Sequence, residues 1–518
     1  MANLGLIPAK WAALTPNAQA VYDVPNDRRI NWVDLDSTVR RLANGLLGLG
    51  LRPGDRVAML SRNSVEYQAL YFAAGRAGLV TQPLNWRLSS PALTEVVRDA
   101  APKVVIVSDE FLEVTRDLQR ALDIPHWFEF GAGGDGSLER LVQSSSDEEP
   151  VTTSRIGDDD PFFILYTGGT TGKSKGALHT HRSAGAGMLN QTVAERIVPS
   201  DVYMLTGQMY HIPIILSMNY LKHGCPLVLV NFEARQALEI IEAEKVSAFL
   251  GITTMLNWMM AVEGFEKYDL SSLRNIQYGG GPMPSSTVRQ ALDSFPCTLI
   301  QGYGQTEGTT MCFLSQEDHA NALEGVHPER LRSCGREGFL TTVRVVDHLG
   351  REVPRDGKTP GEIIVRSEAN MVGYLNQPEL TSQTLRDGWM WTGDVATWDE
   401  DRYIFIVDRA KDMIISGGEN IYSVQVEEAI ASHPAVLECA VIGVPDEEWG
   451  ESAKGFVVLK PGHQATEQEI IEQAKTQLAS YQKPRSVEFV AQLPKAPTGK
   501  ILKRDLRAPY WEDQERGV

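Results

Sequence analysis

The glycine-rich segment YTGGTTGKSKG at residues 166–176 limits the possible folds more than any other feature of the sequence. In a P-loop, a glycine, four further residues and then Gly-Lys-Ser/Thr open a helix. Here Thr167 occupies the position of the first glycine, and Gly168 lies one residue too close to Gly172. Gly176 would also cost a first helical turn about 1 kcal/mol relative to alanine. We therefore predict a loop that no helix follows.

The same segment has the residue types that bind a polyphosphate. Its glycines allow positive φ angles, so that successive backbone N–H groups can converge on an anion, while its hydroxyl and lysine side chains add donors and charge. The preceding PFFILYT, residues 161–167, predicts a short buried strand, which disfavours the alternative of a flexible linker. The residues expected to contact phosphate are Thr167, Gly168, Gly169, Thr170, Thr171, Gly172 and Lys175.

Helical and strand patterns alternate along most of the chain. Residues 39–80 predict a helix, a turn at Pro53-Gly54-Asp55, a strand and a second helix. Short apolar runs of the β type follow at 103–107, 226–230 and 248–252. This alternation is typical of an α/β fold with mostly parallel sheets and ligands at the carboxyl ends of the strands. With 518 residues, the chain is long enough for two to four domains.

A change of pattern near residue 410 predicts a second domain. Residues 401–430 run from a strand through a charged segment to a glycine pair and a helix, and new strands are expected at 435–444 and 454–460. The tail PKAPTGKILKRDLR, residues 494–507, has the composition of a loop that carries Lys500. The predicted architecture is a large multi-subdomain α/β domain and a small α+β domain at the C-terminal end.

Charge and cysteine usage narrow the class of partner. The chain has 49 Lys and Arg against 67 Asp and Glu, a formal charge of −18, which serves solubility and disfavours nucleic acid or anionic membranes as partners. Its five cysteines are scattered and contain no CxxC pair, as expected in a reducing cytoplasm. No secretory signal and no run of 18 apolar residues is visible, so we expect no membrane span.

Seven further motifs occur in the order of one known family. They are GGGP at 279–282, YGQTE at 303–307, GEIIVR at 361–366, WTGD at 391–394, DRAKD at 408–412, SGGENI at 416–421 and PTGK at 497–500. Over essentially its whole length, the sequence resembles the acyl-adenylate-forming enzymes, which include acyl-CoA synthetases, adenylation domains and luciferases. The family's phosphate loop usually has Ser and Pro where this chain has Gly168 and Ser174.

The resemblance implies an ATP-dependent reaction in which a carboxylate attacks the α-phosphate and pyrophosphate leaves. It implies that Glu307 holds Mg²⁺ and that Thr306 binds the α-phosphate. It implies ribose contacts from Asp394 and Arg409. Adenine contacts are expected from Tyr303 and from the backbone of Gly280, Gly281 and Pro282.

The resemblance also implies a domain rotation between two half-reactions. Residues 1–408 would form the adenylate-forming domain, 409–411 the hinge and 412–518 the mobile domain. Lys500 would stabilise the adenylation transition state, and rotation about Lys411 would exchange it for Gly417 and Gly418, beside which a pantetheine arm can pass. The alternative for each lysine is an ordinary surface position.

The acyl pocket implied by the resemblance contains no Asp to bind an amino group. We therefore expect an aryl, hydroxycinnamate-like or medium-chain acid, as in bacterial feruloyl-type and fatty-acid ligases, rather than an amino acid. His211 would gate the carboxylate or help to deprotonate a thiol, and a satisfied core histidine is the alternative. The pocket residues are His211, Ser217, Tyr278, Gly279, Gly302 and Met311.

The expected acceptor is free CoA. Because the chain ends 18 residues after Lys500, we expect no fused carrier domain, while a separate acyl-carrier protein and a homodimer stay open. The rival outside the family is a Walker-type NTPase or kinase, which would release ADP instead of AMP. A nucleotide-binding regulator without catalysis is the third alternative.

Overall fold

The computed structural model describes residues 3–131, 136–167, 174–281, 283–409, 412–417, 419–446, 448–479, 482–495 and 501–511, without the side chain of Asn420. The chain divides into two compact units. The first unit comprises residues 1–343 and 365–390, and the second comprises residues 344–364 and 391–518.

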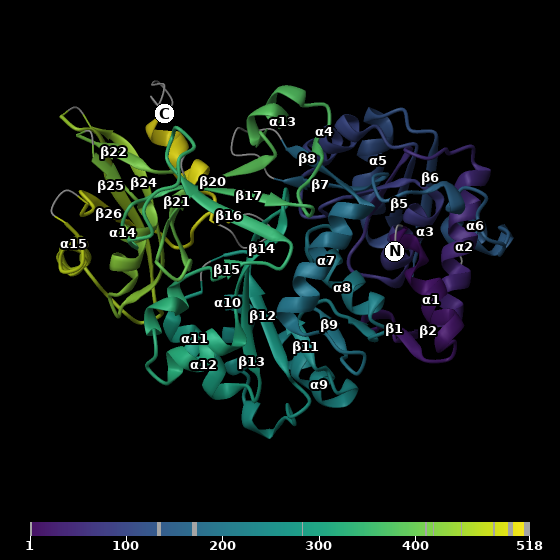
Figure 1. Cartoon of the computed structure of the whole chain (residues 1–518), viewed down its shortest axis with the longest axis horizontal. Helices are drawn as coiled ribbons and strands as arrows, with labels where there is room; N and C mark the ends of the chain where they lie inside the picture. Colours follow the sequence, from purple (N-terminus) through teal and green to yellow (C-terminus); the bar gives the residue numbers. More distant parts are fainter. Residues whose placement is uncertain are drawn as a thin grey trace. The chain divides into compact units, whose positions relative to one another are not determined.

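The first unit contains a nine-stranded sheet that is parallel in its centre (Figure 1). Strands β1, β10, β9, β11, β12 and β13 run parallel. At the edges, β2 pairs antiparallel with β1, β14 pairs antiparallel with β13, and β15 pairs antiparallel with β14. The strands, in sheet order, are β15 (Arg336–Glu337), β14 (Thr309–Leu314), β13 (Thr298–Gln305), β12 (Asn275–Gly279), β11 (Ala248–Leu250), β9 (Tyr203–Leu205), β10 (Leu227–Leu229), β1 (Gln19–Asp23) and β2 (Arg28–Asn31).

A seven-stranded sheet in the same unit carries the glycine-rich loop. Strand β7 leads into the loop and pairs antiparallel with β8 behind it, so a strand and not a helix follows, as predicted. Edge strand β18 pairs antiparallel with β8, and the other strands run parallel to β7. In sheet order they are β18 (Gly373–Tyr374), β8 (Lys175–Thr180), β7 (Pro161–Thr167), β4 (Val80–Pro83), β3 (Arg56–Leu60), β5 (Val104–Ser108) and β6 (His126–Phe130).

Helices of the first unit begin and end where local chemistry favours it. Ser64 caps the N-terminus of α3 by accepting from the Tyr67 backbone N–H, and Gly78 ends that helix in the left-handed conformation. Thr180 and Ser183 form a capping box at the start of α7. The helices are α1 (Ile7–Leu14), α2 (Trp32–Gly48), α3 (Val65–Ala77), α4 (Ser90–Ala100), α5 (Leu112–Ala121), α6 (Ser137–Ser144), α7 (His181–Glu195), α8 (Pro213–Lys222), α9 (Ala234–Glu244), α10 (Thr253–Met260), α11 (Ser285–Ser294), α12 (Gln316–Leu323) and α13 (Pro378–Thr384).

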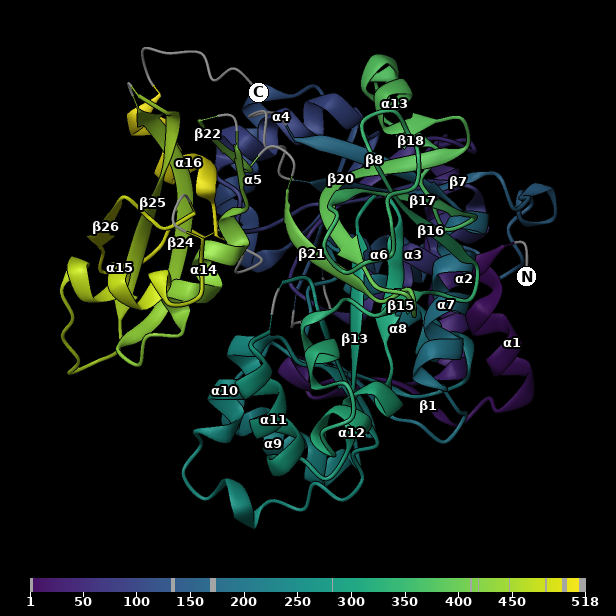
Figure 2. The ribbon, with the colours of Figure 1, turned by 60° about the vertical axis from the view of Figure 1, so that its left-hand side comes forward.

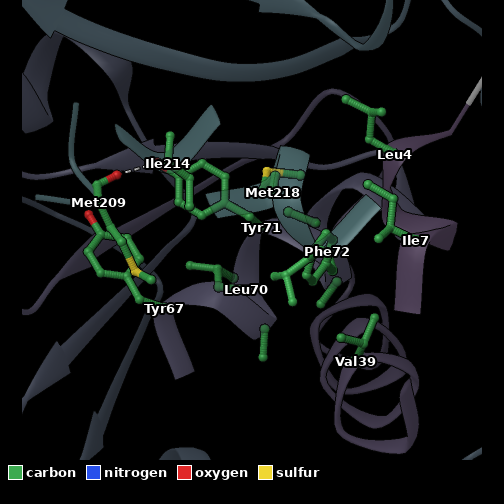
Figure 3. Close-up of a cluster of buried hydrophobic side chains, with 14 of the residues drawn as sticks. Leu4, Ile7, Val39, Tyr67, Leu70, Tyr71, Phe72, Met209, Ile214 and Met218 are labelled. Carbon is green, nitrogen blue, oxygen red and sulfur yellow. Dashed lines mark hydrogen bonds between the residues drawn. The ribbon is translucent and has the colours of Figure 1, made fainter. Parts of the chain in front are cut away.

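The main core lies around α3 and fixes the segment that precedes α8 (Figure 3). The Tyr71 hydroxyl donates to the Met209 carbonyl oxygen over 3.0 Å, and the Met209 N–H donates to Asn63 Oδ1 over 3.0 Å. Met209, Ile214 and Met218 pack with the aromatic face of α3 in the same cluster. Since His211 lies between these anchors, its backbone is placed by the core.

A third sheet contains the points at which the chain passes from one unit to the other. Its order is β16-β17-β20-β19, and β21 pairs with β20. The divisions fall inside β16, β17 and β20. The strands are β16 (Thr341–Val346), β17 (Gly361–Ser367), β19 (Leu385–Arg386), β20 (Trp389–Trp398) and β21 (Ile404–Arg409).

The C-terminal part of the second unit is a five-stranded sheet covered on both faces. Val441 and Val457 pack on one face with α14 and α15, while Ile442 and Phe456 belong to the cluster on the other face, against which Leu506 of α16 packs. Figure 2 draws these strands and helices in yellow-green and yellow. This alternation is the period of two expected of strands. The elements are β22 (Ile414–Ser416), β23 (Glu419–Ile421), α14 (Ser423–Ala431), β24 (Val436–Asp446), β25 (Gly450–Leu459), α15 (Glu467–Lys475), β26 (Ser486–Phe489) and α16 (Lys503–Arg507).

The predicted fold class is confirmed, with a large α/β part and a smaller α+β part. The strand expected at 161–167 is present with those ends, and the strands expected at 103–107, 226–230, 248–252, 435–444 and 454–460 are present with shifted ends. The domain limits 1–408, 409–411 and 412–518 stay a prediction, and so does the rotation about Lys411, which lies outside the described residues.

Candidate active site

The two strands beside the glycine-rich loop hold its ends in place. Thr167 at the end of β7 lies opposite Lys175 at the start of β8 in the antiparallel ladder. The Tyr166 hydroxyl donates to Asp99 Oδ2 over 2.6 Å, which fixes the end of β7. The predicted phosphate contacts Gly168, Gly169, Thr170, Thr171 and Gly172 lie outside the described residues.

Thr306 and Glu307 occupy a tight hairpin between β13 and β14. Thr309 closes this hairpin with a left-handed φ of 55°, and the Gly308 N–H donates to the Gln305 carbonyl oxygen over 3.2 Å. Only glycine fits at position 304, because a Cβ there would lie 1.9 Å from the Thr309 carbonyl oxygen. The turn thus holds Thr306 and Glu307 at the carboxyl end of a parallel strand, where α/β proteins bind ligands.

His179 connects this hairpin to the phosphate-loop strand β8. Its Nε2 lies 2.8 Å from the Thr306 carbonyl oxygen, and its Nδ1 lies 3.0 Å from Ser183 Oγ. Burial lowers the pKa of His179 to about 4, so the ring is neutral and its Nε2–H donates to the carbonyl. Sequence reasoning missed His179, because its partner Thr306 lies 127 residues away.

His181 is also buried in the first unit. Its Nδ1 accepts a hydrogen bond of 3.1 Å from the Leu4 N–H, and its ring stacks on Phe162 at 4.6 Å. These contacts give His181 a structural role.

Glu307 accepts hydrogen bonds from β18 and from the residues just before that strand. The Tyr374 hydroxyl donates to Glu307 Oε1 over 2.7 Å, and the Met371 N–H donates to the Glu307 carbonyl oxygen over 2.7 Å. Each carboxylate oxygen has further lone pairs, so the Tyr374 contact leaves Glu307 able to bind a cation.

A magnesium ion fits this setting. Among the residues that the structure describes, no three His, Cys, Asp or Glu side chains form a ready-made metal cluster. Magnesium in nucleotide sites uses one or two carboxylates and completes its shell with phosphate and water oxygens, so a single Glu307 is an adequate protein ligand.

The expected adenine contacts come from two neighbouring strands. Gly279 at the end of β12 pairs with Gly302 of β13, so Gly280 and Gly281 follow β12 beside the strand that carries Tyr303. A Cβ at position 279 would lie 2.2 Å from the Gly302 carbonyl oxygen, which explains this glycine by strand packing. Pro282 lies outside the described residues.

Asp394 and Arg409 are brought together in the second unit. They are opposite each other in the β20–β21 ladder, and Arg409 Nε lies 3.0 Å from Asp394 Oδ1. The Asp394 side chain is 5% exposed and that of Arg409 is 35% exposed. A buried carboxylate beside a partly exposed guanidinium is a suitable pair for a ribose diol, as the resemblance implies.

His211 carries a ring nitrogen that the described side chains leave unpaired. Its Nε2 is buried and receives no hydrogen bond from the described part of the chain. Burial, assisted by the positive charge of Arg87, lowers the pKa of His211 to about 4. A base this weak is poorly matched to a thiol of pKa about 8.5. The ring therefore suits hydrogen bonding to the acyl substrate better than it suits proton removal from a thiol.

The other expected pocket residues have structural partners. Ser217 is fully buried and donates to Gln68 Oε1 or to the Ile214 carbonyl oxygen. The Tyr278 hydroxyl lies 2.8 Å from His319 Nε2. Met311 is fully buried in β14, and a Cβ on Gly302 would lie 2.9 Å from Thr310 Cγ2. Their role as a pocket stays a prediction.

Two structural features favour glycine at position 417. Its φ is 59°, and a Cβ would lie 2.5 Å from the Trp449 ring. Gly418, Lys411 and Lys500 lie outside the described residues, so their expected roles stay predictions.

Comparison with known proteins gives the family. A family model for the AMP-binding enzymes matches residues 8–375. The chain belongs to this family. A second model, for the C-terminal domain of AMP-binding enzymes, matches residues 425–500. The prediction of an adenylate-forming ligase is thereby confirmed.

Several AMP-binding enzymes are similar to the chain over almost its whole length. A feruloyl-CoA synthase of Amycolatopsis sp is 37% identical over 513 residues, covering 98% of this chain and 99% of the relative. The long-chain-fatty-acid–CoA ligase FadD13 of Mycobacterium tuberculosis is 34% identical, with coverage of 98% and 99%. The fatty acid–[acyl-carrier-protein] ligase ScoC of Streptomyces coeruleorubidus is 32% identical, with coverage of 95% and 93%.

Solved structures of the family share the fold. A fatty acyl CoA synthetase of Mycobacterium tuberculosis has a TM-score of 0.78 at 32% identity, with 99% of each chain covered. ATP-bound MatB from Rhodopseudomonas palustris has a TM-score of 0.86 at 28% identity, with 98% and 99% covered.

In the described part of the chain, no helix combines the length and apolar character needed to span a membrane.

Proposed function

We propose that the protein joins a carboxylic acid to the thiol of CoA through an acyl-adenylate, with release of AMP and pyrophosphate. In the first half-reaction, a carboxylate oxygen of the acid attacks the α-phosphorus of ATP, and the bond from that phosphorus to pyrophosphate breaks. In the second, the thiolate sulfur attacks the acyl carbon, and the carbon–oxygen bond to AMP breaks.

The proposal rests mainly on one contact within the first unit. Strand β8, which follows the phosphate loop, contacts the hairpin that contains Thr306 and Glu307. Strand β8 contributes His179, which binds the Thr306 backbone over 2.8 Å. The hairpin contributes Glu307, and Tyr374 binds it over 2.7 Å while lying under Lys175 of the phosphate loop. The strand that follows the expected anion-binding loop thus lies beside the Glu307 carboxylate, which supports a reaction at a nucleotide phosphate.

Positioning and charge neutralisation are the main tasks of these residues. The Thr306 hydroxyl and the loop N–H groups would bind phosphoryl oxygens, and Lys175 would add positive charge. Glu307 would hold Mg²⁺, which neutralises charge on the phosphates when it is bound. Asp394 and Arg409 would fix the ribose, and Lys500 would contact both reacting partners in the transition state.

The proposed acid is an aryl, hydroxycinnamate-like or medium-chain carboxylic acid. The neutral His211 beside Tyr210, whose rings lie 4.6 Å apart, suits a carboxyl group with an apolar or aromatic body. The relative named as a feruloyl-CoA synthase supports a hydroxycinnamate-like acid, and the relative named as a long-chain-fatty-acid–CoA ligase supports an aliphatic acid but not a medium chain length.

The experiment is mass spectrometry of products formed from Mg·ATP, CoA and a mixed panel of aryl, cinnamic and straight-chain acids. We expect AMP and one preferred class of acyl-CoA. ADP as the nucleotide product would contradict the proposal and support a kinase-like or NTPase reaction.

A carrier-protein acceptor is the second candidate, because the similar ScoC is named as a fatty acid–[acyl-carrier-protein] ligase. In that case the panel would give pyrophosphate and accumulated acyl-adenylate without acyl-CoA. Addition of a phosphopantetheinylated carrier protein would then consume the adenylate.

A further inference from the structure

The short strand β18 stabilises β8, the strand that follows the phosphate loop. It pairs with β8 through Gly373 opposite Leu178 and Tyr374 opposite Ala177. Two further backbone bonds extend this contact, from the Val372 N–H to the Leu178 carbonyl oxygen over 3.0 Å and from the Leu375 N–H to the Gly176 carbonyl oxygen over 2.8 Å.

Asn376, two residues after β18, is linked through Asp99 to strand β7. Asn376 Nδ2 donates to the Asp99 carbonyl oxygen over 2.8 Å, and the Asp99 carboxylate accepts from the Tyr166 hydroxyl over 2.6 Å. The backbone around Tyr374 is therefore held by hydrogen bonds to β8 and, through Asn376 and Asp99, to β7.

From this position Tyr374 contacts two residues that the sequence assigns to ATP binding. Its hydroxyl donates to Glu307 Oε1 over 2.7 Å. The Lys175 ammonium lies over its ring, 5.6 Å from the ring centroid, within the range of a cation–π contact. One side chain thus lies between the carboxylate expected to hold Mg²⁺ and a lysine expected to contact phosphate.

We propose that Tyr374 is a positioning residue for the reaction, whose hydroxyl orients the Glu307 carboxylate for Mg²⁺. The inference rests on the proposed function of this site.

The phenol is suited to a permanent donor role. A phenol hydroxyl is a hydrogen-bond donor at neutral pH, and Glu307 Oε1 accepts from it over 2.7 Å. Groups behind a metal ligand that fix its orientation typically change metal affinity or activity about 10- to 100-fold when they are removed.

The test is Tyr374→Phe, which removes the hydroxyl and keeps the ring. Tyr22→Phe is a matched control, because the Tyr22 hydroxyl donates to Asp27 over 3.1 Å and Arg29 lies over its ring at 3.6 Å. For each protein, calorimetry measures ATP affinity across a series of Mg²⁺ concentrations, and pyrophosphate release gives the adenylation rate.

We expect Tyr374→Phe to raise the Mg²⁺ concentration for half-maximal ATP affinity about tenfold, as loss of a residue behind a metal ligand does. Tyr22→Phe should leave it unchanged, and adding Tyr374→Phe to Glu307→Gln should have little further effect. An unchanged Mg²⁺ requirement in Tyr374→Phe, or full additivity with Glu307→Gln, would overturn the inference. If the wild type released ADP, the proposed function would fail, while the Mg²⁺ series would still decide the role of Tyr374.

Discussion

Replacing Asp394 by asparagine should weaken ATP binding much more than it destabilises the fold. The Asp394 side chain is nearly buried and faces Arg409 across the β20–β21 ladder at 3.0 Å. Because Arg409 is 35% exposed, solvent screens this ion pair, and its contribution to stability is about 0–1 kcal/mol. A hydrogen bond from a ribose hydroxyl to the carboxylate should contribute about 1.5–3 kcal/mol to binding.

The assay compares ATP with 2′-deoxy-ATP by calorimetry. The wild type should bind ATP at least about tenfold more tightly, which corresponds to the lower limit of that hydrogen-bond energy. In Asp394→Asn the preference should nearly vanish, because the amide is a weaker acceptor and lacks the charge.

Asp201→Asn is a matched control, since Asp201 pairs with Arg274 at 2.7 Å with side-chain exposures of 3% and 35%. This variant should keep the preference for ATP over 2′-deoxy-ATP. A full preference retained by Asp394→Asn, or no preference in the wild type, would refute the assignment of Asp394 to the ribose.

Three further predictions concern two lysines of the C-terminal part and one buried glutamate. Lys500→Ala should abolish adenylate formation and leave thioester formation from supplied acyl-adenylate largely intact; equal loss in both half-reaction assays would refute its role. Lys411→Pro should spare adenylation and block thioester formation, and normal rates in both halves would exclude a hinge there. Burial raises the pKa of Glu195 to about 8, so the folded protein retains a proton that the unfolded chain releases. Stability should fall as pH rises from the ordinary range of a carboxyl group to about 8. In Glu195→Gln, thermal melts should lose this part of the pH dependence, and an unchanged profile would show that Glu195 is not the proton-binding group.

The local elements of the fold are predictable because their causes are local. The aromatic and aliphatic run at 161–167 favours a strand, and Gly176 disfavours a helix behind the loop, which is what the β7–β8 hairpin shows. The alternating faces of Val441 and Ile442 likewise follow from neighbouring residues in β24.

The contacts that assemble the site depend on residues far apart in the chain, and no local pattern contains them. Tyr374 binds Glu307 across 67 positions, and His179 binds Thr306 across 127. The resemblance to a family supplied Glu307 and Thr306 through their motif, but it gave no reason to choose Tyr374 or His179.

Gly279 shows that a residue chosen for one reason can be required for another. The sequence suggests that this glycine leaves room for the acid. In the structure, a Cβ at position 279 would lie 2.2 Å from the Gly302 carbonyl oxygen, so the close approach of β12 and β13 already requires glycine. Such a requirement arises only when two strands pair, and the sequence of either strand alone does not contain it.

The central claim is that the carboxylate of the acid attacks the α-phosphorus of ATP. The most direct measurement uses an acid labelled with ¹⁸O in both carboxylate oxygens, followed by mass spectrometry of the nucleotide released in a complete reaction with CoA. The account predicts AMP that carries one ¹⁸O atom, because the attacking oxygen stays on phosphorus when the thiol displaces AMP. Unlabelled AMP, or label in inorganic phosphate accompanied by ADP, would contradict it.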